Sequence, residues 1–227
     1  MPRLQARRPE HFLAAGAWGC VGAAERVLRA FREGGELWGA YVAARTAIEL
    51  AVRAAIERGI ARPRRCAELP GALVEAGILE TGEGLALAEI IRASKRLHRL
   101  ERREIARIAE GAMKIVDRLA AGSPPRAAAR VGEGVVHALR AAGVRAAYLV
   151  GPNALAVKLG SRALEDVLKL AAELSAELGV PPERLLVLDA ESPGNLERVA
   201  LYGRLVYAED PSAEVSWLVD SYIELFC

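Results

Sequence analysis

The sequence predicts a two-domain α+β protein, in which an N-terminal antiparallel helical bundle is followed by a small α/β domain. Apolar residues of the first half recur at helical spacing, whereas short apolar runs of strand length alternate with helices in the second half. Gly122–Pro125 reads GSPP and separates the two halves. We therefore expect a bundle over 1–121, a linker over 122–134 and an α/β domain over 135–227.

The helices of the first half are predicted from apolar spacing and from their stop signals. The segment 37–58 places small apolar residues on one face, and Gly59 and Pro63 end it. Further helices are expected over 66–76, from about 80 through Ile91, and over 101–121. Thr81 is the expected N-cap of the helix that ends near Ile91.

The second half alternates helices with strands. Helices are expected over 135–142, 161–178, 195–201 and 213–226, and strands over 146–150, 154–159, 185–189 and 203–207. Gly143 and Gly179 are expected to end the first two helices, and Ser161 to cap the second. Such an order is typical of a small α/β domain.

Composition narrows the class of protein. The chain is 52% hydrophobic and 26% charged with a net charge of +2, which is ordinary for a soluble globular protein. No apolar run approaches the length of a membrane span, and the N-terminal stretch is too weakly apolar for a signal peptide, so a cytoplasmic protein without a membrane partner is expected. One glutamine and two asparagines suit a thermophile, although a GC-rich genome has the same effect.

The cysteines predict neither a disulfide framework nor a metal site. Cys20, Cys66 and Cys227 are odd in number, widely spaced and without a C-x-x-C pair. Reduced structural thiols are the expectation, and no metal or cofactor is predicted.

The candidate site is Ile91–Arg99, which reads IRASKRLHR. Five residues separate Arg92 from His98. An arginine that neutralises a phosphate, beside an imidazole that transfers protons near neutral pH, is a pair able to cleave RNA. Two alternatives stay open: a solvated basic face, or contact with the RNA backbone without cleavage. The expected RNA-binding side chains are Lys95, Arg96, Arg99, Arg102 and Arg103.

The first half resembles the HEPN family over roughly Ala23–Leu119. The resemblance rests on a long helix centred on Glu49, a proline-containing turn, a short helix, the AGIL turn and a helix that ends in the basic segment with His98. It implies a dimeric helical bundle and a metal-independent endoribonuclease with Arg92 and His98 as catalytic residues. Two positions depart from the family pattern: Ala93 stands where the commoner spacing puts the arginine, and Leu100 where a tyrosine is common.

The second half resembles the minimal nucleotidyltransferases, the partners of HEPN toxins. The best match is 183–226, with its strand, helix, YGRLVYAED return and final helix. The family holds magnesium on three aspartates, but here Pro152, Ala154 and Leu186 fall on those positions. In a second register, Gly160–Ala163 is the phosphate turn and only Asp166 follows. Both registers imply that nucleotide transfer is lost.

Together these features predict a fused HEPN/nucleotidyltransferase protein of toxin–antitoxin type that binds RNA and has Arg92 and His98 as its cleavage pair. The resemblance implies a homodimer through the helical domain. The alternatives are a non-catalytic scaffold or RNA-binding assembly protein, and an active nucleotidyltransferase. Structural roles are expected for several other side chains. Glu49 should pair with Arg45, and the tryptophans should anchor a core or an interface (Trp18, Trp38 and Trp217). The isolated histidines, His11 and His137, should pack in the core or face solvent.

Overall fold

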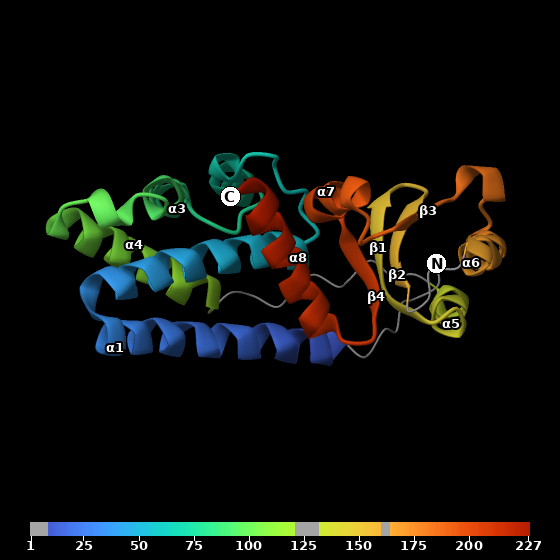
Figure 1. Cartoon of the computed structure of the whole chain (residues 1–227), viewed down its shortest axis with the longest axis horizontal. Coiled ribbons are helices and arrows are strands. Elements are labelled where there is room, and N and C mark those ends of the chain that lie inside the picture. The colour runs from blue at the N-terminus through green and yellow to red at the C-terminus, as the bar shows by residue number, and fades with distance from the viewer. Residues whose placement is uncertain (1–8, 121–131, 160–163) are drawn as a thin grey trace. The chain divides into compact units, whose positions relative to one another are not determined.

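The computed structural model describes residues 9–120, 132–159 and 164–227, with side chains described over 22–120, 132–159 and 167–227 (Figure 1). The chain forms two compact units. The helical unit comprises 14–55, 62–124 and 222–227, and the sheet unit comprises 1–13, 56–61 and 125–221. These ranges differ from the expected division, since 222–227 group with the helices and 56–61 group with the sheet.

The expected linker over 122–134 lies outside the described residues except at its end. That end is not a linker, because Glu133 and Gly134 already belong to a helix, α5. The helix expected over 135–142 therefore begins two residues earlier than predicted.

The helical unit contains α1 (Pro9–Glu57), η1 (Cys66–Glu68), α2 (Leu69–Glu75), α3 (Thr81–Ser94), η2 (Leu97–Arg99) and α4 (Arg102–Ala120). Helix α1 turns back on itself at Gly35, whose φ of 76° is a conformation that favours glycine (Figure 1). The guanidinium of Arg26 on the first arm donates to the Thr46 hydroxyl on the second at 3.0 Å.

The second arm of α1 is built on alanine. Six alanines at helical spacing are fully buried, namely Ala40, Ala43, Ala44, Ala47, Ala51 and Ala55. Side chains this small let other helices approach closely, so the helix predicted over 37–58 is confirmed together with its buried face. Helix α3 begins at Thr81, so the expected cap is wrong by one residue. The N-cap is Glu80, whose N–H donates to Glu83 Oε2 at 2.8 Å in a capping box.

The sheet unit contains α5 (Glu133–Ala141), β1 (Val144–Gly151), β2 (Ala154–Leu159), α6 (Leu164–Leu178), η3 (Pro182–Arg184), β3 (Leu186–Asp189), α7 (Pro193–Tyr202), β4 (Arg204–Ala208) and the first part of α8 (Pro211–Phe226). From Tyr222 onward, α8 belongs to the helical unit. The strands follow the order β3-β2-β1-β4; β2 and β3 are parallel, and β1 is antiparallel to β2 and β4. The four predicted strands are therefore confirmed, and Gly143 and Gly179 follow α5 and α6 with positive φ, as expected. Ser161 lies outside the described residues.

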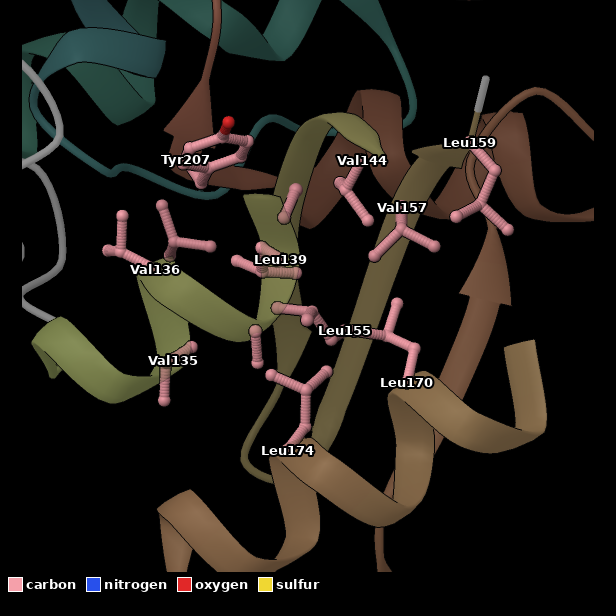
Figure 2. Packing of buried hydrophobic residues seen from close by; sticks show 13 residues of the cluster. Val135, Val136, Leu139, Val144, Leu155, Val157, Leu159, Leu170, Leu174 and Tyr207 are labelled. Carbon is pink, nitrogen blue, oxygen red and sulfur yellow. The ribbon is translucent and has the colours of Figure 1, made fainter. Parts of the chain in front are cut away.

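The core of the sheet unit fills the space between the β1–β2 hairpin and two helices. Leu139 of α5 and Leu170 and Leu174 of α6 are fully buried against Leu155 and Val157 of β2 (Figure 2). Side chains of a strand alternate between its faces, so the neighbouring positions of β2 point to the opposite face of the sheet.

Two cysteines form a disulfide within the helical unit. Cys66 and Cys227 are bonded, with their Cα atoms 5.0 Å apart. The expectation of reduced thiols is therefore wrong for both residues, because the fold brings together side chains 161 positions apart. The side chain of Cys20 lies outside the described residues. Disulfides persist in oxidising compartments and inside hyperthermophilic cells, so the cysteines no longer argue for a reducing compartment. Among the described helices, none has both the length and the apolarity needed to cross a membrane.

Tyr222 predicts a pH dependence for the helical unit. Its fully buried hydroxyl donates to the Pro63 carbonyl at 2.8 Å, and burial raises its pKa to about 12 although nearby Arg62 opposes the increase. The folded state thus favours the protonated phenol. This contribution to stability is complete below the unfolded pKa of about 10 and is lost as the pH rises towards the folded value.

We therefore expect the free energy of unfolding to fall between about pH 10 and 12. Tyr222→Phe should flatten this decrease while lowering stability near neutral pH by about 1 kcal/mol, since a hydrogen bond is lost. Urea unfolding at a series of pH values measures both effects. Tyr202→Phe, at an exposed tyrosine, is the control. An unchanged alkaline slope in Tyr222→Phe would contradict the assignment.

Candidate functional site

The two residues of the predicted cleavage pair lie on successive elements and differ in their surroundings. Arg92 is exposed near the end of α3, and its Nε donates to the Ala88 carbonyl at 3.1 Å, which turns the guanidinium back along its own helix. His98 is exposed on η2, where its Nε2 accepts a hydrogen bond from Arg99 Nε at 3.2 Å. In this arrangement the Arg99 guanidinium occupies the Nε2 acceptor of His98, so a substrate would have to displace it before Nε2 could act as a general base.

A hollow of about 570 Å³ lies in the helical unit beside His98. One wall is a single face of the second arm of α1, because the spacing of three or four residues aligns Trp38, Tyr41, Arg45 and Ile48. The end of α3 and η2 contribute Ser94, Lys95, Leu97 and His98. Ile223 near the end of α8 and Cys227, which follows that helix, complete the lining. The lining thus combines aromatic, cationic and imidazole side chains.

The aromatic part of the hollow is a stacked pair. The rings of Trp38 and Tyr41 have centroids 5.6 Å apart and are inclined by 15°. They are 52% and 46% exposed, so Trp38 is not a core anchor. Gly34 makes room for the indole, because a Cβ at this position would collide with the Trp38 ring. A glycine at position 34 therefore leaves space for an aromatic ring that is not part of the hydrophobic core.

The cations of the hollow are not equally available. Arg45 Nε donates to Glu49 Oε1 at 2.9 Å, and Arg26 pairs with the other oxygen of Glu49 at 2.7 Å. The predicted Arg45–Glu49 pair is thereby confirmed. Lys95 is exposed and has no carboxylate partner among the residues that the structure describes. Lys95 is thus the lining cation most available to an anion.

The rest of the predicted basic cluster lies outside the hollow. Arg102 pairs with Glu36 at 2.7 Å, and Arg99 donates to His98. Arg96 and Arg103 are exposed, and no carboxylate pairs with either in the described part of the chain. Of the predicted site residues, the hollow brings together only Lys95 and His98. Trp38, Tyr41 and Arg45 also line the hollow. Their spacing in the sequence indicates that they share one helix face, but it does not indicate that this face lies beside His98.

The sheet unit does not present the carboxylates of a nucleotidyltransferase at the expected positions. Pro152 lies in the β1–β2 turn, Ala154 begins β2 and Leu186 begins β3. Asp189 Oδ1 accepts from the Glu191 N–H at 3.0 Å in a local turn. No group of three acidic, histidine or cysteine side chains able to hold a metal occurs in the described residues. The register that uses Ser161 and Asp166 falls where side chains are not described.

Instead, the sheet unit buries a charged cluster that the sequence did not indicate. Lys158 of β2 is 4% exposed, and its Nζ lies 2.7 Å from Glu214 Oε2 of α8 and 3.4 Å from the Trp217 ring centroid. Tyr148 of β1 donates its hydroxyl to the same Glu214 oxygen. Burial, and then the charge of Glu214, raise the pKa of Tyr148, so this hydroxyl remains a donor. Trp217 is partly buried in this cluster, where its ring centroid lies 5.7 Å from that of Tyr148.

Comparison of the chain with protein-family models, with curated proteins and with solved structures finds no match. The function must therefore be inferred from the chemistry of the hollow and of the buried cluster. The isolated histidines contribute to neither, since His137 is exposed on α5 and the side chain of His11 lies outside the described residues.

Proposed function

We propose that the protein binds RNA through the hollow of its helical unit. The observation that carries the proposal is Lys95, a cation without a carboxylate partner among the described residues, in one hollow with His98 and a half-exposed aromatic pair. Phosphate groups attract such cations, and unpaired bases stack on aromatic rings. Exposed Arg96 and Arg103 on neighbouring segments extend the positive surface along which an RNA backbone would lie.

The sheet unit is proposed to be a nucleotidyltransferase-like scaffold without transfer activity. Its support is the set of apolar residues, Pro152, Ala154 and Leu186, where the family has aspartates. The whole chain would then be a fused HEPN/nucleotidyltransferase protein of toxin–antitoxin type. The HEPN resemblance also supports a homodimer through the helical unit.

Salt-dependent binding of single-stranded RNA tests the proposal. Lys95→Ala should weaken binding of different RNA sequences equally and reduce the slope of log affinity against log salt by about 1, because one phosphate contact is removed. Fluorescence anisotropy of labelled RNA measures both. Lys114→Ala is the matched control, because Lys114 is an exposed lysine that already pairs with Glu110 at 2.7 Å. Equal affinity and slope in Lys95→Ala and wild type would contradict the phosphate contact.

The same samples, kept in EDTA, decide between binding and metal-independent cleavage. Cleavage is the second candidate because the imidazole of His98 lines the hollow beside Lys95. The imidazole would take the proton of a ribose 2′-hydroxyl, whose oxygen attacks phosphorus to form a 2′,3′-cyclic phosphate. The bond from phosphorus to the 5′-oxygen breaks, and that oxygen takes a proton from water. Arg92 could stabilise the extra negative charge only if its guanidinium turned from Ala88 towards the RNA.

We expect retention of intact RNA. Products that disappear in His98→Ala would favour the ribonuclease. Transfer of a label from ATP that needs magnesium would instead overturn the inactive assignment of the sheet unit.

A further inference from the structure

Phosphate binding by Lys95 does not explain why two aromatic rings are exposed in the hollow. Trp38 and Tyr41 are stacked and nearly parallel, and about half of each side chain is exposed. Exposed apolar surface rimmed by charged groups commonly marks a binding site. Here the rim includes Arg45, Lys95 and His98.

The size and chemistry of the hollow suit a nucleotide. Its volume of about 570 Å³ lies within the range of about 300–1,000 Å³ found for small-molecule sites. A nucleotide has a flat aromatic base and an anionic group, and the hollow offers two half-exposed aromatic rings together with an available ammonium. The two kinds of group come from different elements, since the rings lie on α1 and Lys95 follows α3.

We infer that the hollow is a base-stacking subsite for single-stranded RNA. An unpaired base stacks on the Trp38–Tyr41 surface while Lys95 contacts an adjoining phosphate. A base inside a duplex is already stacked on its neighbours and cannot occupy this surface. Every base has an aromatic face, so the subsite favours single strands over duplexes with little preference for sequence. This inference rests on the proposed RNA binding and names its substrate class.

An abasic strand isolates the stacking contribution, because it keeps every phosphate and removes the bases. We compare a labelled short oligoadenylate with an abasic strand of equal phosphate number by fluorescence anisotropy. The wild-type protein should bind the intact strand about 5- to 150-fold more tightly, which is the effect of stacking one base. Trp38→Ala should abolish most of this ratio, whereas Trp38→Phe should retain much of it.

Two further variants separate stacking from altered folding. Tyr41→Leu keeps an apolar side chain but removes the second ring, and it should also reduce the ratio. Leu85→Ala is the control, because Leu85 is 67% exposed on α3 and does not line the hollow. Circular dichroism verifies that each variant has the wild-type helix content.

The outcomes distinguish the base-stacking subsite from the RNA-phosphate binding on which it rests. If the wild-type protein binds both strands equally and Lys95→Ala weakens both, the stacking subsite is overturned and phosphate binding stands. If the ratio persists in Trp38→Ala and Tyr41→Leu, the base is bound elsewhere and the assignment is also overturned. If the wild-type protein binds neither strand, both proposals fail.

Discussion

Replacing Cys66 and Cys227 by serine is expected to lower the free energy of unfolding by about 2–5 kcal/mol. The disulfide closes a segment of 161 residues. A cross-link over so long a segment removes many conformations from the unfolded chain, and the chain-entropy model gives about 5 kcal/mol for this length. Urea unfolding followed by circular dichroism, with and without a dithiol reductant, measures the difference.

The reductant supplies the internal control. It should shift the wild-type unfolding curve towards that of the double variant and leave the double variant unchanged. Titration of thiols in the denatured protein should find two fewer without reductant than with it. An equal number of thiols under both conditions would show that the bond is absent.

Breaking the buried ion pair of the sheet unit should have an effect of similar size. Lys158→Ala or Glu214→Ala is expected to cost about 3–5 kcal/mol, because each leaves the opposite charge without its partner in a poorly hydrated site. Lys158 is 4% exposed, and Glu214 also accepts the hydroxyl proton of Tyr148. The loss should therefore exceed that of an ordinary surface ion pair, which is about 0–1 kcal/mol.

A double variant tests whether pairing, rather than side-chain volume, is responsible. Lys158→Met with Glu214→Gln removes both charges, keeps similar volumes and preserves an acceptor for Tyr148. It should cost much less than the sum of the two single losses, since buried ion pairs are often replaced at little cost. Lys114→Ala, at an exposed ion pair on α4, should leave the urea midpoint unchanged. A wild-type midpoint in Lys158→Ala would contradict the buried pair.

Local sequence patterns were sufficient to predict most of the helices and strands. Spaced alanines mark the second arm of α1, and Gly143 and Gly179 mark the ends of α5 and α6 because each glycine adopts a positive φ. The sequence predicted the first residue of a helix less exactly than its last residue. Glu80 and Thr81 are neighbouring polar residues, and only the backbone conformation shows which of them is the cap.

The candidate site was only partly predictable. The basic segment indicated Lys95 and His98, but Arg92 turns back to Ala88, and the hollow takes Arg45 from α1. Nothing in the sequence places α1 beside η2, since they are distant along the chain and their contact is tertiary. For the same reason the sequence predicted Trp38 as an anchor of a core or an interface, and did not indicate that it stacks on Tyr41.

By itself the sequence determined the order of helices and strands, and the absence of aspartates at Pro152, Ala154 and Leu186. These are properties of residue type and local periodicity. Tertiary structure decided the Cys66–Cys227 bond, the Lys158–Glu214 pair and the lining of the hollow. Each joins residues from separate elements, and their meeting depends on how helices and sheet pack, which local spacing does not encode.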